Sequence, residues 1–256
     1  MKQVPDTTEV RIHPETNTLV REGVTSIINP FDTYAIEEAV RLRERLGGGR
    51  VTVLSMGPPQ AEASLRESLS VGADEGVLLS DRAFAGADTW ATSYTLATAL
   101  RGMKPDLILC GKQAIDGDTA QVGPGISVHL GIPQVCYVSK IREIGRERAV
   151  VECLLEEGHE VLEVGLPCVM TVVKEINEPR LPSLKGMIRA KKAAITVLTA
   201  EDIRADARCI GLTGSPTQVR RIFSPPRRSA GEIIEGTSAP DKAARLFARL
   251  KELQVL

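Results

Sequence analysis

The chain has 256 residues, of which 43% are hydrophobic and 25% are charged, and its formal net charge is −1. This composition suits one globular domain, or one domain with an extended arm, and it excludes a global basic field that would attract nucleic acid or an acidic membrane. No apolar run approaches the roughly 20 residues that a membrane-spanning helix needs, so we expect neither a nucleic-acid partner nor a transmembrane segment.

The cysteines and the N-terminus indicate a cytoplasmic protein. The five cysteines are scattered, and none has the C-x-x-C spacing of a redox or zinc motif. The N-terminal residues lack the apolar core of a signal peptide. The three histidines are far apart and never in an H-x-x-x-H spacing, so we expect no metal site.

The first 135 residues or so alternate predicted helices with predicted strands. The first helix begins with Asp32 as its cap, turns Ala35, Ile36, Ala39, Val40 and Leu46 inward, and ends at residues 47–49, which are three glycines. Three further helices are predicted around residues 61–71 and 88–100 and up to residue 130, and strands at 51–54, 76–79 and 106–110. Strict alternation implies right-handed crossovers, so we expect an α/β fold of the Rossmann-like type, with a doubly wound and mostly parallel sheet.

The pattern changes after Val135. Four strand-like runs at residues 135–141, 149–155, 160–164 and 168–173 predict an antiparallel meander attached to the parallel sheet. Beyond Val173 the chain turns polar and is broken by prolines, and we expect this stretch to bury little. A final amphipathic helix from Asp241 to about Leu253 is typical of a partner-binding arm. We therefore predict an α/β nucleotide-binding domain over residues 1–200 and an extended arm over residues 201–256.

The beginning of the sequence is unusual for such a fold. A doubly wound sheet normally begins with a strand, but only Met1–Val4 precede the turn at Pro5 and Asp6. An interior first strand would contribute several kcal/mol, at roughly 1.5–3 kcal/mol for each buried aliphatic side chain. We hypothesise that the natural start lies a few residues upstream, and a native Met1 found by N-terminal mass spectrometry would contradict this.

Residues 110–124 carry the clearest chemical signal. They connect the end of a predicted strand to the start of a helix, which is where open α/β sheets bind ligands and where free N–H groups receive a phosphate. Gly111 and Gly117 allow close approach of the backbone. The alternative is an ordinary glycine-rich connection. The segment is not a Walker A motif, and no G-x-G-x-x-G follows the early strands.

Other chemistry finds little support. Residues 85–89 faintly resemble the S-G-G-x-D-[ST] loop of ATP pyrophosphatases, but they lack its first serine and second glycine. We find no Ser–His–Asp arrangement and no paired-carboxylate site, and we expect Asp116 and Asp118 to order their loop rather than to act as acid and base. A stand-alone adenine-nucleotide binder remains an alternative, although it would have no need of the long arm. Either alternative predicts a colourless protein.

The run G-K-Q-A-I-D-x-D from Gly111, followed by Gln121 and Gly123, resembles the adenine-nucleotide loop of electron transfer flavoprotein beta subunits. Residues 26–32 and 56–58 match two further loops of that family, and residues 174–180 through 190–192 match its signature near the end of the domain. The resemblance covers essentially the whole chain in order. It implies a heterodimer with an alpha subunit that holds an FAD, while the beta subunit binds an adenine nucleotide.

The resemblance also implies which residues contact that nucleotide. The predicted contacts are Asn29, Met56, Gly57, Gly111, Lys112, Gln113, Ala114, Ile115, Asp116, Gly117, Asp118, Thr119, Ala120, Gln121 and Val122. The family also uses backbone of its first strand, which this sequence lacks.

Residues 79–89 are similar to the S-D-R-x-F-G-G-A-D-T stretch of the electron-bifurcating members, with Ala85 in place of a glycine. The likeness adds Arg82, Gly86, Asp88 and Thr89 to the predicted site. It implies a second FAD in this subunit, NADH as the electron donor, and ferredoxin or flavodoxin together with an acyl-CoA dehydrogenase-type flavoenzyme as partners. The alternative is a conventional subunit with a structural AMP that shuttles electrons from dehydrogenases to a quinone reductase. In the simpler interpretation, Asp81 and Arg82 form a surface pair and residues 85–87 a small-residue turn.

Residues 181–185 resemble the loop with which family members bind partner dehydrogenases. Leu184 stands where the family has an exposed anchoring leucine; alternatively, this leucine packs locally. The basic residues Arg189, Lys191 and Lys192 follow without interleaved aromatic residues, which favours a solvated face over a nucleic-acid site.

Overall fold

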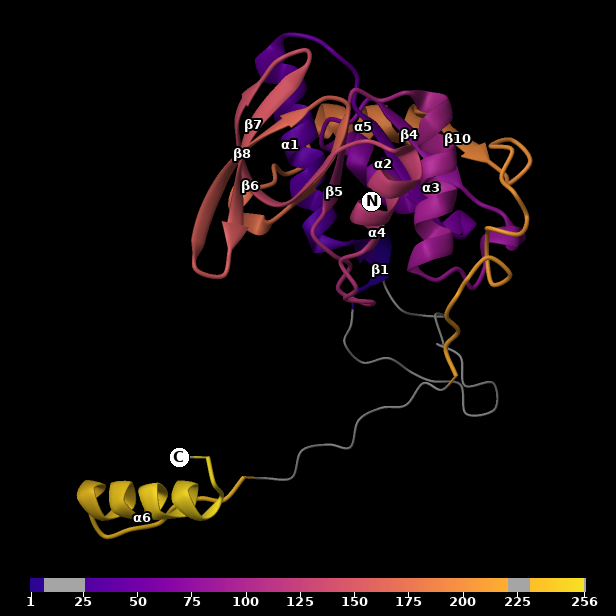
Figure 1. Cartoon of the computed structure of the whole chain (residues 1–256). Coiled ribbons are helices and arrows are strands. Elements are labelled where there is room, and N and C mark those ends of the chain that lie inside the picture. Colours follow the sequence, from indigo (N-terminus) through magenta and orange to yellow (C-terminus); the bar gives the residue numbers. More distant parts are fainter. Residues whose placement is uncertain (7–25, 221–230, 256) are drawn as a thin grey trace. The chain divides into compact units, whose positions relative to one another are not determined.

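The computed structural model describes residues 1–6, 26–220 and 231–255. They belong to two units, Met1–Arg221 and Ile222–Leu256, which are described separately. In the first unit helices and strands alternate from residue 26 to residue 130, and four strands then follow one another over residues 134–172 (Figure 1). The described residues include no helix that is long and apolar enough to cross a membrane.

The first half of this unit alternates as the sequence predicts. Its elements are β1 (Gln3–Pro5), β2 (Ser26–Ile28), α1 (Pro30–Leu46), β3 (Thr52–Met56), α2 (Glu62–Ser70), β4 (Glu75–Leu79), α3 (Thr89–Met103), β5 (Leu107–Gly111) and α4 (Val122–Leu130). The second half adds β6 (Gln134–Ile144), β7 (Arg148–Leu155), β8 (Gly158–Gly165), β9 (Cys168–Val172), α5 (Leu184–Lys192) and β10 (Ile195–Leu198).

The strands form two larger sheets and a short antiparallel ribbon of β1 and β2. One sheet has the order β10-β4-β3 with all strands parallel, and the other has the order β5-β9-β6-β7-β8. The α/β class with mainly parallel pairing near the predicted site is thus confirmed. The predicted meander needs a correction, because only β6, β7 and β8 are antiparallel. β9 instead lies between β5 and β6 and runs parallel to both.

Helix α1 begins earlier than predicted. Pro30 occupies its first turn, where the missing N–H costs nothing, and Asn29 is the N-cap residue. Asp32 is therefore not the cap; it lies in the first turn and its carboxylate bonds elsewhere. At the other end, Gly47 closes the helix in the left-handed conformation with φ 69°, but the predicted inward residue Leu46 is 58% exposed.

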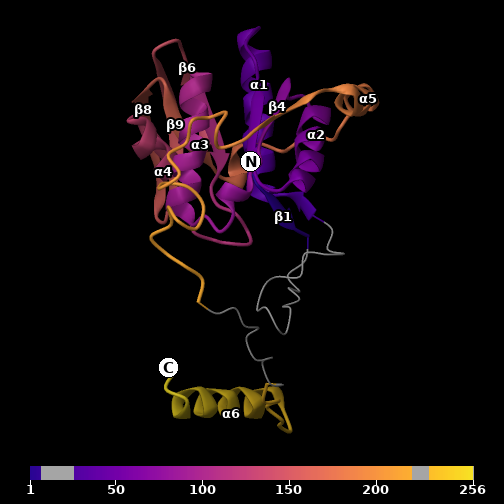
Figure 2. The same cartoon turned by 90° about the vertical axis from the view of Figure 1, so that its right-hand side faces the viewer.

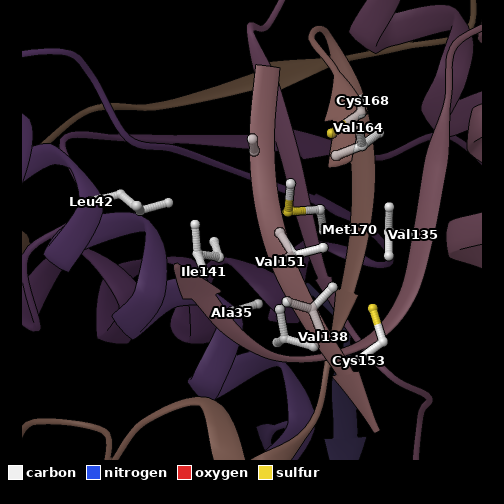
Figure 3. Packing of buried hydrophobic residues seen from close by; sticks show 12 residues of the cluster. Ala35, Leu42, Val135, Val138, Ile141, Val151, Cys153, Val164, Cys168 and Met170 are labelled. Carbon is white, nitrogen blue, oxygen red and sulfur yellow. The ribbon is translucent and has the colours of Figure 1, made fainter. Parts of the chain in front are cut away.

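Helices cover both faces of the sheets. Helices α1 and α2 pack on one side, where α5 lies beside α2 (Figure 2). Helices α3 and α4 pack together and cover the other side of β4, β5 and β9. Below α1, the side chains of Ala35 and Leu42 face an apolar layer from β6, β7 and β9, including Val138, Ile141 and Met170 (Figure 3). Coverage on both faces explains why β4 and β9 are almost continuously apolar and buried, whereas β7 alternates buried and more exposed residues.

The polar stretch after Val173 buries more than its composition predicts. It contains α5 and β10, neither of which the sequence analysis identified, and β10 pairs with β4. Further along, Ile203, Ala205 and the buried Ile210 pack near Leu79 and Phe84. The first unit therefore passes the predicted division at residue 200 and extends to Arg221.

The described part of the second unit contains α6 (Ala239–Glu252), close to the predicted final helix. Ser238 caps it by accepting a hydrogen bond from the Asp241 N–H. None of its residues is buried in the described structure, and Leu246 and Phe247 are 46% and 59% exposed.

Candidate functional site

The first unit contains a cavity of about 3160 Å³ whose wall includes one edge strand of each larger sheet, β3 and β5. The loops that follow β3, β4 and β5 line it at the carboxyl ends of these strands, the usual ligand position in open α/β sheets. Nearly all residues of the predicted nucleotide site lie in this wall. Asp118 does not; its carboxylate instead accepts a hydrogen bond from Gln113.

Asn29 braces the loop after β5. It is 1% exposed, its Nδ2 donates to the carbonyl oxygen of Gln113 at 2.8 Å, and its Oδ1 accepts from the N–H of Ile115 at 3.1 Å. Both ends of the amide are thus bonded to the loop, and this buried polar group is satisfied. Asn29 therefore fixes the backbone of residues 113–115, which belong to the predicted site.

Asp32 is a site residue that the sequence analysis missed. Its Oδ1 accepts from the N–H of Gly111 at 3.0 Å and its Oδ2 from the N–H of Lys2 at 2.7 Å. Gly111 is required beside it, because a Cβ there would lie 2.6 Å from the carbonyl carbon of Phe31. The only local sign of this role was a carboxylate in the first helical turn, which the cap interpretation explained equally well.

The start of α4 is arranged to receive an anion. Asp118 and Ala120 have φ values of 52° and 54°, and Gln121 follows Ala120 with φ −107° and ψ −17°. Successive left- and right-handed residues form a concave nest of N–H groups, and the helix dipole adds partial positive charge. Within the described residues, no side chain caps α4. A Cβ on Gly117 would meet nothing within 4 Å, so the approach is open there.

The charged side chains of this loop have partners within the protein. The Lys2 Nζ pairs with the Asp116 carboxylate at 2.6 Å, which neutralises a negative charge near the nest. The Lys112 Nζ lies 5.4 Å from the centre of the Tyr137 ring, a cation–π contact. The side chain of Lys112, one of the predicted nucleotide contacts, thus already contacts Tyr137 on β6.

The loop after β4 is held by its own backbone contacts. The Asp81 carboxylate accepts from the N–H groups of Ala83 at 3.0 Å and Ala200 at 3.1 Å, and these bonds lower the pKa of Asp81. In this part of the described chain the Asp81 carboxylate is thus held by backbone N–H groups and not by an ion pair with Arg82. Arg82 is exposed and lies in the cavity wall.

Gly86 has a structural reason of its own to be glycine. Its φ is 76°, a left-handed value that disfavours other residues, and a Cβ would lie 3.2 Å from the Cβ of Leu212. A bulky substitution at Gly86 would therefore disturb Leu212 whether or not a ligand is present. Close approach of a flat ring is not needed to explain this glycine.

Asp88 joins the loop after β4 to a distant segment. Its Oδ1 caps α3 through the N–H of Ala91 at 3.0 Å, and its Oδ2 accepts from the N–H and Oγ1 of Thr217 at 3.0 and 2.8 Å. Its own N–H donates to the Ser215 Oγ at 2.8 Å. Thr217 also lines the cavity, and no local pattern in the sequence could have identified it.

The two loops meet at one point. The Thr89 Oγ1 donates to the Gln121 Oε1 at 3.4 Å, and so the loop after β4 contacts the start of α4. Leu184 lies apart from this cavity, at the first position of α5, and is 71% exposed. All the predicted nucleotide contacts except Asp118 therefore line one cavity, and Leu184 lies on a separate exposed surface.

The described residues contain no group of three or more metal-ligating side chains. All five cysteines are free thiols. His129 is packed against the rings of Trp90 and Tyr94, with ring centres 4.5 and 5.6 Å away, and its burial lowers the pKa of the imidazole.

Comparison with known proteins identifies the family. Residues 16–203 match the electron transfer flavoprotein domain. The whole chain is 52% identical to 98% of the electron transfer flavoprotein subunit beta of Thermoanaerobacterium thermosaccharolyticum. It is 51% identical to 97% of the caffeyl-CoA reductase-Etf complex subunit CarD of Acetobacterium woodii, again over all of this chain. Over 95% of its length it is 47% identical to 87% of the protein FixA of Bradyrhizobium diazoefficiens. The chain therefore belongs to the electron transfer flavoprotein family, among its beta subunits.

Proposed function

We propose that this protein is the beta subunit of a heterodimer that binds FAD in the described cavity and takes part in flavin-based electron bifurcation. The observation that supports this best is the meeting of the Ser80–Thr89 and Gly111–Val122 loops in one cavity wall, with Thr89 bonded to Gln121. The first loop carries the residues that are similar to the bifurcating members of the family. In this role NADH donates a hydride, and single electrons go to ferredoxin or flavodoxin and to an acyl-CoA-type dehydrogenase.

The residues of the cavity suit an adenine dinucleotide. The uncapped start of α4 and the nest at Ala120 and Gln121 offer N–H donors for phosphate oxygens. FAD supplies the hydride and one-electron chemistry, and the protein supplies binding, orientation and electrostatics. Arg82, exposed in the wall, would place positive charge beside a bound anionic group.

The second candidate is a conventional subunit with a structural AMP, serving electron transfer from dehydrogenases to a quinone reductase. One observation favours it, because Leu212 and the left-handed backbone explain Gly86 without a flavin ring. Both AMP and FAD have a phosphate that could bind at the start of α4. Contacts with the loop after β4 would therefore distinguish the two nucleotides.

An alpha subunit that carries its own FAD is the partner expected for this chain. The apolar residues of α6, including Leu246 and Phe247, are exposed in their own unit and are available for such a partner. The relative CarD is named as a subunit of a caffeyl-CoA reductase-Etf complex, which supports a dehydrogenase-type partner here. A cytoplasmic location and the lack of a nucleic-acid partner stay predictions from composition.

The test is the nucleotide content of the heterodimer, measured by denaturing extraction and chromatography. Two FAD molecules and no AMP per heterodimer are expected. One FAD with one AMP would contradict bifurcation and leave the conventional role. Arg82→Gln is the informative variant, because Arg82 is exposed and its loss is expected to lower FAD retention without unfolding the chain. Arg142→Gln, which alters an exposed ion pair with Glu152 outside the cavity wall, is the matched control.

A further inference from the structure

Four large apolar side chains are exposed together on and just before α5. They are Leu181, Leu184, Met187 and Ile188, with exposed fractions of 88%, 71%, 41% and 51%, and we call them the docking surface. Single exposed apolar residues are ordinary, but a contiguous group within eight residues indicates an interaction site. Lys185, Lys191 and Lys192 are exposed around it.

The chain just before the docking surface is fastened to α1. The Asn177 Nδ2 donates to the carbonyl oxygen of Tyr34 at 3.1 Å and to the Glu38 Oε2 at 3.0 Å. The Arg41 Nη2 donates to the carbonyl oxygen of Glu178 at 2.7 Å. These contacts join segments that are more than 130 residues apart in the sequence.

Arg180 is the strongest of these attachments. Its Nε lies 2.8 Å from the Glu37 Oε2, and its Nη1 lies 2.7 Å from the Glu44 Oε1. Its backbone N–H also donates to the Glu37 Oε2 at 3.2 Å. Glu37 is only 3% exposed, and although burial raises its pKa, the bonds from Arg180 and Arg41 outweigh this and hold the pKa below its usual value. One guanidinium thus bridges two turns of α1 directly before Leu181.

The other end of the docking surface is fastened to α2. The Arg189 Nη2 donates to the carbonyl oxygens of Leu69 and Ala73, both at 2.8 Å. Gly186 allows α5 to pack this closely against the end of α2, because a Cβ at this position would lie 2.1 Å from the carbonyl oxygen of Ser70. The docking surface is therefore held at both ends, while its own apolar side chains bury little.

We propose that Arg180 is a positioning residue for the docking of a partner flavoenzyme: it orders the docking surface without touching the partner. This inference rests on the proposed function, which supplies a dehydrogenase-type partner. The exposed lysines indicate the partner's chemistry, an apolar recess with an acidic rim. A segment that is ordered before binding avoids the entropy cost of ordering at the interface, and this is where Arg180 acts.

The experiment measures electron transfer from a purified acyl-CoA dehydrogenase to the αβ heterodimer, with the heterodimer concentration varied to obtain KM and kcat. Arg180→Ala is expected to raise KM about ten-fold and to leave kcat and flavin content unchanged, since lost preorganisation weakens binding only. Hydrogen exchange of residues 181–188 is expected to accelerate. In Arg180→Lys the side chain can reach only one of the two carboxylates. Its KM and its exchange rate are expected to lie between those of the unmodified heterodimer and those of Arg180→Ala.

Two further variants separate the possible failures. Leu184→Ala removes a proposed direct contact and is expected to raise KM without changing exchange. Arg142→Ala is the control. It removes an ion pair away from the docking surface, in which the Arg142 Nη2 lies 2.6 Å from the Glu152 Oε2, and it is expected to behave like the unmodified heterodimer. The inference is overturned if Arg180→Ala leaves KM unchanged, or raises KM while exchange of residues 181–188 stays slow. If Leu184→Ala also has no effect, the proposed docking surface itself is wrong.

Discussion

At the scale of single residues, the cavity uses its polar side chains mainly to shape its backbone. Asn29, Asp32 and Asp88 all lie in the cavity wall, and each has carboxylate or amide atoms bonded to N–H or carbonyl groups of this chain. The groups left for a ligand are largely backbone N–H groups and open space at Gly117. The sequence could therefore predict where the site lies, from the glycines and the strand–helix connection. It could not show which residues bind a nucleotide and which support the loop.

Gly111 and Gly117 provide a matched test of this distinction. Gly111→Ala brings a Cβ within 2.6–2.8 Å of Phe31 and the Asp32 nitrogen, and we expect a loss of about 1–3 kcal/mol in the free energy of unfolding. Gly117→Ala meets nothing, and we expect a change within about 0.5 kcal/mol. Urea unfolding followed by the fluorescence of Trp90, the single tryptophan, measures both. Equal losses would show that the two glycines do not differ as described.

Asp88 makes stability depend on pH in a defined direction. Partial burial alone raises its pKa, but the hydrogen bonds from Ala91 and Thr217 outweigh it and hold the pKa below the ordinary value. The unfolded chain then takes up the proton first as the pH falls. The contribution of Asp88 is complete above the unfolded value of about 3.9 and is lost as the pH falls through the lower native value.

The matched variant is Asp88→Asn, which loses the charge but keeps the size. It is expected to be less stable than the unmodified chain by about 1 kcal/mol at pH 7, because the amide nitrogen of Asn cannot accept the two bonds from Thr217, although the amide oxygen can still cap α3. This difference should shrink below pH 4, as seen in urea unfolding at several pH values. A difference that is constant from pH 7 to pH 3 would contradict an ionised Asp88 in these bonds.

At the scale of elements, the spacing of apolar residues predicted helices such as α2 correctly, but it could not predict which strands pair. Helix α2 has Ala61 just before it and Leu65 and Leu69 at helical spacing, and all three are buried as expected. The place of β9 between β5 and β6 depends on pairing across the chain, which spacing does not encode. Strand β10 was missed because it is half exposed and pairs with β4, more than 100 residues earlier. The prolines and charges of the wider stretch after Val173 led the composition to suggest an arm.

The end of the first unit can be tested by truncation. A chain that ends at residue 200 loses the buried Ile210 and the bond from the Leu212 N–H to the Ala85 carbonyl oxygen, at 3.0 Å. We expect it to be less stable in urea by at least about 1.5–3 kcal/mol than a chain that ends at residue 220, since one buried isoleucine accounts for that much. Equal stabilities would instead support the division at residue 200.

At the scale of the first unit, the candidate site joins two sheets. The loops after β3 and β4 belong to the β10-β4-β3 sheet, whereas residues 111–122 follow β5 of the other sheet. In the described residues β3 and β5 are both sheet edges that face the same cavity. A nucleotide that contacts both sets of loops would therefore link the two halves through noncovalent bonds.

Such a link has a measurable consequence for the whole unit. Adding FAD or AMP at 100 times its dissociation constant to nucleotide-depleted heterodimer should stabilise it by about 2.7 kcal/mol, because a ligand that binds only the folded state shifts unfolding by mass action. Hydrogen exchange should slow in both sheets, in β3 and β4 as well as in β5 and β9. Protection confined to residues 111–122 would mean that the nucleotide contacts one sheet only. Protection at residues 80–89 with FAD but not with AMP would show that the loop after β4 recognises the flavin half, which an AMP-binding subunit has no reason to do.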